Sequence, residues 1–117
     1  MTVHSLETLT FDNSYARLPE VFYAKVSPTP FSAAPFLISA NRAAMELLDL
    51  DPAEAARPEF AGVFGGSLLI PGMEPLAMLY SGHQFGVYVP QLGDGRAILL
   101  GEVTNGRGER WDLHLKG

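Results

Sequence analysis

The amino-acid sequence predicts an α+β fold in which an N-terminal arm and short helices precede an antiparallel β-sheet. The prediction depends on where the chain changes character. All 12 glycines lie at or after Gly62, whereas six of the nine prolines precede it. Apolar residues recur at helical spacing before that point and at alternate positions from Val87 onward. We therefore divide the chain into an extended arm and helix over residues 1–60 and a β-rich part over residues 61–117.

The arm is expected to be extended over much of its length. Pro19, Pro28, Pro30 and Pro35 punctuate it. Each proline disfavours the helical conformation in the residue before it and lacks a backbone amide donor. The sequence therefore predicts irregular, extended chain rather than helix in this part of the arm.

Two short helices are predicted after the arm. Ser39 can cap a helix over residues 41–50, which is rich in helix-forming residues and has apolar side chains on one side. The apolar stripe comprises Ile38, Met45 and Leu48, with Ala44 and Leu47 beside it. A second helix is expected over residues 58–64, because Gly65-Gly66 is a common helix stop.

Three antiparallel strands are predicted downstream. Apolar and polar residues alternate around Val87–Val89 and over residues 110–116, and residues 97–103 form a short apolar run bounded by turn residues. Asn105-Gly106 tolerates positive φ, so the last two strands should form a hairpin that turns between Thr104 and Glu109.

Composition excludes several functional classes. The chain has 8 Lys+Arg against 13 Asp+Glu, which gives a net charge of −5, and only two of the bases are lysines. A nucleic-acid partner is therefore not expected. The absence of cysteine excludes disulfides, thiol nucleophiles and cysteine-based metal sites. No apolar run has the length of a membrane span and the first residues do not resemble a secretion signal, so we expect no membrane partner and a cytoplasmic location.

A glycine-rich turn is the first candidate site. Gly93 and Gly95 flank one residue and are followed by Arg96, between two predicted strands. Without Cβ atoms the backbone amides can approach an anion closely, and the arginine guanidinium adds donors that suit phosphate. The alternative is a plain β-hairpin turn, because Asp-Gly is also a common tight-turn pair.

Lys116 is the second candidate. Strand alternation places Asp112, His114 and Lys116 on one face and Trp111, Leu113 and Leu115 on the other. A lysine at the end of a strand near a glycine turn can neutralise nucleotide phosphates, so the pair suggests ATP binding. The alternative for Lys116 alone is a solvated charge at a sheet edge.

His83 carries neither catalysis nor a metal site in this interpretation. Only two other histidines exist, and the Gly-x-Ser-x-Gly motif of serine hydrolases is absent. A structural, hydrogen-bonded histidine is expected, and we predict no metal ligands and no catalytic residue in this chain.

Four separated strings resemble the N-terminal part of one family, selenoprotein O, also called YdiU. The strings are Phe11-Asp12-Asn13-Ser14-Tyr15, Tyr80-Ser81-Gly82-His83-Gln84-Phe85-Gly86, Gln91-Leu92-Gly93-Asp94-Gly95-Arg96-Ala97 and Asp112-Leu113-His114-Leu115-Lys116-Gly117. The resemblance extends over essentially the whole chain.

This resemblance implies the N-terminal part of a protein-kinase-like fold that transfers AMP from ATP to hydroxyl side chains (Ser, Thr or Tyr) of other proteins. It implies that Gly93, Gly95 and Arg96 form the nucleotide-binding loop and that Lys116 is the phosphate-binding lysine. It further implies Mg²⁺ or Mn²⁺ as a cofactor, with ligands and a general base beyond Gly117. The 117 residues alone should then lack transferase activity and expose apolar surface that a downstream segment would cover.

Two other classes of function stay open at this point. The chain could be a binding module that holds a nucleotide or another anion without chemistry. It could also be a structural or interaction fragment, in which Gly93 to Arg96 form only a turn.

Overall fold

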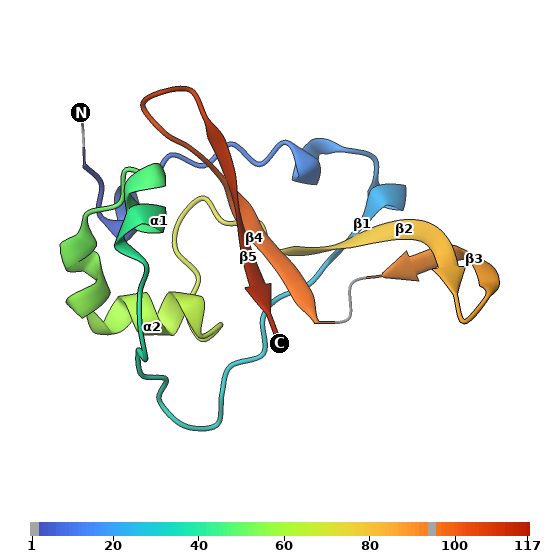
Figure 1. The fold of residues 1–117 in the computed structure, drawn as a ribbon, viewed down its shortest axis with the longest axis horizontal. Helices are drawn as coiled ribbons and strands as arrows, with labels where there is room; N and C mark the ends of the chain where they lie inside the picture. The colour runs from blue at the N-terminus through green and yellow to red at the C-terminus, as the bar shows by residue number, and fades with distance from the viewer. Residues whose placement is uncertain (1–2, 94–95) are drawn as a thin grey trace.

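The structure, a computed structural model of the chain, describes residues 3–93 and 96–117 and contains an antiparallel sheet with two short α-helices (Figure 1). The regular elements are β1 (Tyr23–Lys25), α1 (Arg42–Leu47), α2 (Pro58–Phe64), β2 (Leu76–Gln84), β3 (Val87–Gly93), β4 (Ala97–Thr104) and β5 (Arg110–Lys116). Short 3₁₀ helices occur at Leu6–Thr8, Tyr15–Arg17, Glu20–Phe22 and Pro52–Ala56. The predicted α+β class is confirmed, and the kinase-like arrangement stays a prediction.

The sheet is ordered β1-β2-β4-β5, and β3 pairs with β2 outside this path. Strand β2 changes neighbours along its length: Leu76 pairs with Leu99 of β4, whereas the residues from Leu79 onward pair with β3. The β2–β3 hairpin therefore projects from one side of the molecule, and both helices lie on the opposite side of the β4–β5 hairpin (Figure 1).

The three predicted strands are confirmed as β3, β4 and β5, and the turn between β4 and β5 lies where Asn105-Gly106 predicts it. The Asn105 side-chain oxygen accepts hydrogen bonds from the amides of Arg107 and Glu109, and Gly108 has a φ of 78°. Along β5, Leu113 is buried while Asp112, His114 and Lys116 are exposed, as the alternation predicts, but Trp111, predicted on the face of Leu113, is 38% exposed.

Strand β2 was not predicted. Its first residues, Leu76 and Ala77, are buried, but from Tyr80 onward it forms half of the projecting hairpin and has little core to contact. Apolar and polar residues alternate in a strand when one of its faces is buried. A strand that lies outside the core, held by backbone pairing, therefore has only weak alternation in its sequence.

Helix α2 spans Pro58–Phe64, as predicted, and is followed by Gly65 and by Gly66 with a φ of 82°. The prediction for α1, residues 41–50 with Ser39 as cap, was wrong at the cap and at the end of the helix. The helix is Arg42–Leu47, and its N-cap is Asn41, whose side-chain oxygen accepts a 3.1 Å hydrogen bond from the Ala44 amide. Met45 and Leu48 are buried as expected, but Ile38 precedes the helix and is exposed.

Replacing Asn41 with alanine is expected to lower the free energy of unfolding by about 1 kcal/mol, because the Ala44 amide loses its capping acceptor. Chemical denaturation would measure the change. Ser39→Ala is the matched control, since Ser39 lies outside the helix, and it should leave the unfolding midpoint unchanged. Equal losses for both variants would contradict the assignment of the cap.

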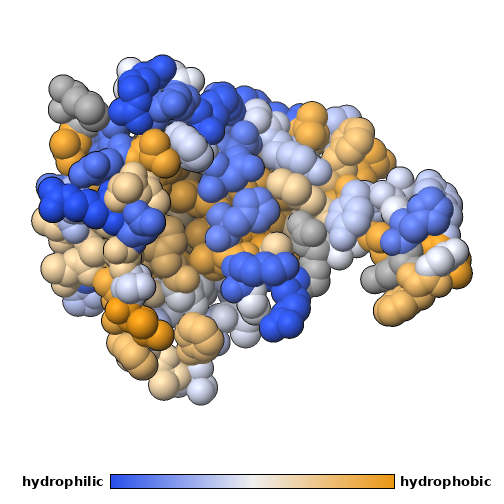
Figure 2. Space-filling view, viewed as in Figure 1, coloured by the Kyte–Doolittle hydropathy of each residue, from blue (hydrophilic) through white to orange (hydrophobic). Residues whose placement is uncertain are grey.

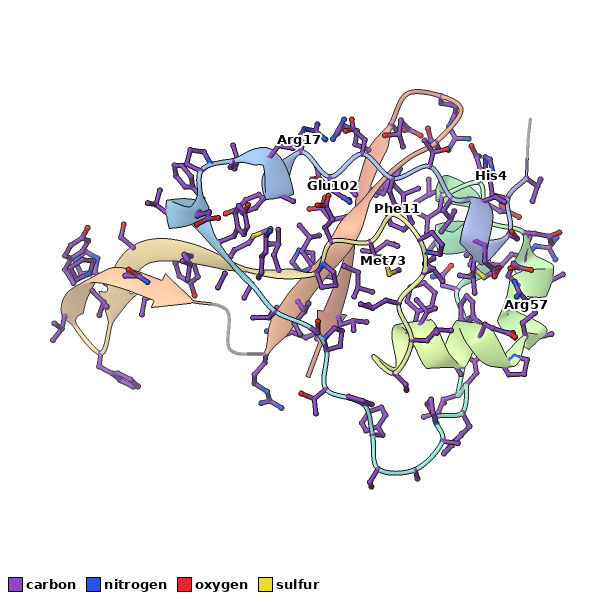
Figure 3. All side chains as sticks on the ribbon, turned by 180° about the vertical axis from the view of Figure 1, so that it is seen from behind. His4, Phe11, Arg17, Arg57, Met73 and Glu102 are labelled. Carbon is purple, nitrogen blue, oxygen red and sulfur yellow. The ribbon has the colours of Figure 1, made fainter. Side chains whose placement is uncertain are left out.

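One hydrophobic core joins the arm, both helices and the β4–β5 hairpin. Its buried members include Leu6, Met45, Phe60, Leu100 and Val103. Phe11 and Met73, both visible from behind in Figure 3, pack against the same core. Residues from both sides of position 60 thus share a core, and a division of the chain at that point stays a prediction. Among the described residues, no helix has the length and apolar character needed to cross a membrane.

Candidate functional site

The structure brings Arg96 and Lys116 together. Arg96 directly precedes β4, Lys116 is the last residue of β5, and the strand pairing sets Lys116 opposite Ala97. The amide of Gly117 donates a 2.8 Å hydrogen bond to the Arg96 carbonyl oxygen. The start of β4 and the end of β5 therefore meet, as Figure 1 shows near the C-terminus.

Of the two glycines predicted to bind nucleotide, Gly93 and Gly95, only Gly93 lies among the described residues. Gly93 ends β3 opposite Leu79, and a Cβ atom there would lie 3.2 Å from Leu79 Cδ2, so close packing between the strands favours glycine. Gly95 lies outside the described residues, and its nucleotide-binding role stays a prediction. Within residues 3–93 and 96–117, β3 and β4 each pair with β2 and not with each other, so the described strands give no support to the plain-hairpin alternative.

A cavity of about 360 Å³ adjoins the two cationic residues. Arg96 and Lys116 line it together with residues of the arm and of the segment after α2: Pro28, Thr29, Phe31, Gly65 and Gly66. Gly66 permits this approach: a Cβ atom at its position would lie 3.0 Å from Pro28 Cβ, and its φ of 82° disfavours other residues. The cavity is of the size that small-molecule ligands occupy in proteins.

Arg96 and Lys116, like Lys25, form no ion pair with a described carboxylate. The other arginines all form one: Arg17, Arg42, Arg57, Arg107 and Arg110. Two neighbouring cations that lack carboxylate partners and border one cavity create a positive potential suited to an anion. Both side chains are exposed, so a ligand can reach them.

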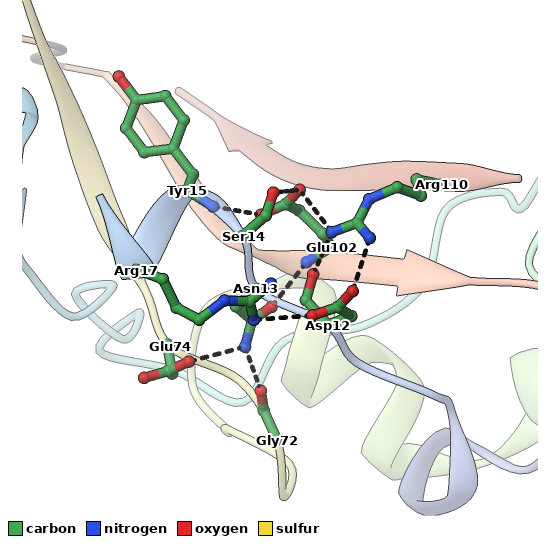
Figure 4. A network of polar contacts seen from close by, with 9 residues as sticks. All are labelled: Asp12, Asn13, Ser14, Tyr15, Arg17, Gly72, Glu74, Glu102 and Arg110. Carbon is green, nitrogen blue, oxygen red and sulfur yellow. Dashed lines mark hydrogen bonds and ion pairs between the residues drawn. The ribbon is translucent and has the colours of Figure 1, made fainter.

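The arm docks on the sheet in a way that no pattern in the sequence predicts. Residues 12–15 cross the edge of β4 and form a polar network with it (Figure 4). Asn13 is 7% exposed. Its side-chain nitrogen donates to the Gly72 carbonyl at 2.6 Å and to Glu74 Oε2 at 3.1 Å. Its side-chain oxygen accepts from the backbone amide of Glu102 at 2.8 Å. Gly101 allows this contact, because a Cβ atom there would lie 2.8 Å from Asn13 Oδ1.

Glu102 is the second centre of this network. Its carboxylate accepts from the Ser14 hydroxyl at 2.6 Å and the Tyr15 amide at 2.7 Å. Burial by itself raises the pKa of Glu102, but these hydrogen bonds and Arg110 outweigh it, so the pKa lies below its ordinary value. Hydrogen bonds from Arg110 and Arg17 likewise lower the pKa of Asp12. The Phe11–Tyr15 string thus has a visible structural role, and only its similarity to a family had marked it.

Stability is expected to fall in acid partly because of Glu102. A lowered folded-state pKa means that the carboxylate stabilises the fold above its unfolded pKa of about 4.5, and that this contribution is lost as the pH falls toward the folded value. Denaturant unfolding between pH 3 and 7 should show a smaller acid loss for Glu102→Gln than for the wild type. Glu46→Gln, which removes only an exposed ion pair with Arg42, is the control. Parallel curves for the wild type and Glu102→Gln would contradict the prediction.

Comparison with known proteins gives consistent results. The family model described as "Protein adenylyltransferase SelO" matches residues 5–117. The chain is 64% identical over 113 residues to "Protein nucleotidyltransferase YdiU" of Myxococcus xanthus (strain DK1622), covering 97% of this chain and 23% of the relative. Proteins of the same name are 58% identical over 113 residues in Thiobacillus denitrificans (97% and 23% covered) and 55% over 115 residues in Thioalkalivibrio sulfidiphilus (98% and 23%). The chain thus spans 23% of the length of each of these relatives.

Proposed function

Because the chain belongs to the protein adenylyltransferase SelO family, we propose that it forms the nucleotide-binding part of an enzyme that transfers AMP from ATP to hydroxyl side chains of proteins. The relatives are named protein nucleotidyltransferases, so transferase chemistry characterises the family. ATP as the nucleotide, and Ser, Thr or Tyr as the acceptor, belong to our proposal.

The observation that carries the proposal is the pair of cations at one cavity. Arg96 directly precedes Ala97, the strand partner of Lys116, and both cations line the cavity and lack carboxylate partners among the described residues. A triphosphate supplies several negatively charged oxygens over a short distance. As a ligand for two adjacent cationic donors, it is therefore a better match than a molecule with a single carboxylate. Arg96 would bind phosphate oxygens through its guanidinium and Lys116 would neutralise their charge. Gly93 and Gly95 would let the backbone approach the nucleotide.

A divalent cation, Mg²⁺ or Mn²⁺, is part of the proposed reaction, but the described residues do not fit it. No group of three His, Asp or Glu side chains within residues 3–93 and 96–117 is arranged to hold a metal ion. The cavity beside Arg96 and Lys116 is bordered by cations rather than carboxylates. The protein ligands of the metal are therefore proposed to belong to a longer polypeptide.

The chain by itself is expected to bind nucleotide without transferring it. In AMP transfer, an acceptor oxygen bonds to the α-phosphorus, the bond to the β-phosphate oxygen breaks, and pyrophosphate leaves. The acceptor hydroxyl must also give up its proton to a base. None of the described side chains that line the cavity is a carboxylate or an imidazole that could accept this proton.

Transfer of label from α-phosphate-labelled ATP to protein tests the proposal. We expect no label from the 117-residue chain, and labelled protein when the full-length Myxococcus xanthus relative is assayed in parallel with Mg²⁺ or Mn²⁺. Label transferred by the short chain and lost in Lys116→Ala would contradict its expected inactivity. A full-length relative that binds ATP but transfers no label would contradict the proposed reaction and favour a non-catalytic binding module.

A further inference from the structure

Residues 31–38 expose several large apolar side chains. Phe36 is 82% and Ile38 89% exposed, and Phe31 and Leu37 are exposed as well. With Ala61 and Phe64 of α2, this segment lines a groove of about 660 Å³, which we call the apolar groove. Hydrophobic side chains gather at the lower left of the molecule in Figure 2, below α2. Single exposed apolar residues are common, but a continuous apolar groove indicates a binding surface.

The apolar groove is a defined surface of the fold. Pro35 lies against the end of α2 so closely that a Cβ atom at Gly65 would be 3.0 Å from Pro35 Cβ. Phe64, on the opposite side of the groove, packs against the main core and lies 4.8 Å from Phe60, measured between ring centroids. The segment is thus held against a helix that is itself anchored, while Phe36 and Ile38 lack cover.

The apolar groove adjoins the cavity beside Lys116. Phe31, Phe64 and Gly65 line both, and Gly117 lines the second. A polypeptide that continued past Gly117 would therefore emerge next to the groove. The relatives have such additional chain, since the matched region is 23% of their length.

We propose that the apolar groove is the docking surface for an apolar segment of the remaining part of the family polypeptide. Its lining is apolar apart from Ser32 and Ser39 and holds no charged residue, so it fits an uncharged segment and not an acidic or basic peptide. Burying Phe36 and Ile38 would then attach the nucleotide site to the rest of the enzyme. The proposal depends on family membership and on the groove, and it holds whether or not Arg96 and Lys116 bind ATP.

Hydrogen–deuterium exchange provides the test. We would compare the 117-residue chain with a chimera in which Gly117 continues into the remaining part of the Myxococcus xanthus relative, both without ATP. In the chimera, amides of residues 31–38 should exchange at least about tenfold more slowly. Amides at the tip of the β2–β3 hairpin, where Phe85 is 99% exposed, provide the internal reference and should not change. Equal exchange of residues 31–38 in both proteins would overturn the proposal.

Matched substitutions separate docking at the apolar groove from nonspecific association of exposed apolar side chains. Phe36→Ser and Ile38→Ser should lower the melting temperature of the chimera by several degrees and leave that of the 117-residue chain unchanged. Phe85→Ser, which also removes an exposed apolar side chain, should change neither. An equal effect of Phe85→Ser would overturn the proposal. The proposal would also be overturned if the 117-residue chain formed a dimer that persisted at its lowest measurable concentration and protected residues 31–38 from exchange. A second copy of the chain would then be the occupant of the groove.

Discussion

Replacing Lys116 with alanine is expected to weaken ATP binding by about 10- to 100-fold. One charge-assisted hydrogen bond contributes roughly 1.5–3 kcal/mol, and each 1.4 kcal/mol corresponds to a factor of about ten in affinity. Lys116 and Arg96 approach the same cavity from paired strands, so Arg96→Ala should have an effect of similar size. Titration calorimetry or equilibrium dialysis with ATP would measure both.

The control for this experiment is Lys25→Ala. Lys25 is an exposed lysine that also lacks an ion-pair partner among the described residues, but it lies in β1 and lines a different cavity. This variant changes the net charge by the same amount and should retain wild-type affinity. If Lys25→Ala weakened binding as much as Lys116→Ala, the effect would reflect overall charge. If neither Arg96→Ala nor Lys116→Ala altered affinity, the site would be wrong and the interaction-fragment interpretation would be favoured.

Replacing Asn13 with alanine is expected to lower the free energy of unfolding by about 2–4 kcal/mol. The substitution removes three hydrogen bonds and leaves the Glu102 amide and the Gly72 carbonyl without their partner. A buried polar group left unsatisfied costs roughly 1–3 kcal/mol. Because the arm contributes Leu6 and Leu9 to the main core, loosening it at Asn13 should destabilise the whole fold, as a single cooperative shift in denaturation.

Asn13→Asp separates hydrogen bonding from packing. It has nearly the same shape as asparagine and can still accept from the Glu102 amide, but it cannot donate to Gly72 and adds a carboxylate beside Glu74. We expect it to be destabilising at neutral pH and less so in acid, where protonation restores a donor. Asn13→Ala with wild-type stability would show that the network in Figure 4 does not anchor the arm.

The elements that were predicted correctly are those with local causes. Pro58 and Gly65 delimit α2, and Asn105-Gly106 sets the turn of the last hairpin. Residues 110–116 alternate because one face of β5 packs against the core. In each case the deciding interactions lie within a few residues of one another, so the sequence pattern records them directly.

The errors have a common cause in long-range contacts. The cap of α1 is Asn41 and not Ser39, a choice between two suitable residues that depends on where the chain reaches the core. Ile38 is exposed although its spacing placed it in the stripe. Strand β2 exists through its pairing with β3, and half of it has no core to mark it in the sequence.

In the candidate site, the adjacency of Arg96 and Lys116 and the shape of the cavity beside them have different origins. That Arg96 and Lys116 would be neighbours follows from a hairpin whose turn the sequence specifies, since pairing outward from Asn105 brings those positions together. The rest of the cavity lining, which includes Pro28, Thr29, Phe31 and Gly66, comes from segments far away in the sequence.

By itself the sequence determined the residue types, the strand and helix periods and the family, because these depend on composition and on neighbours along the chain. Only the tertiary structure decided that Arg96 and Lys116 border a cavity, that Asn13 and Glu102 hold the arm, and that Phe36 and Ile38 stay uncovered. Burial and pairing of distant segments are set by packing of the whole molecule, and no local pattern encodes which surfaces that packing leaves exposed.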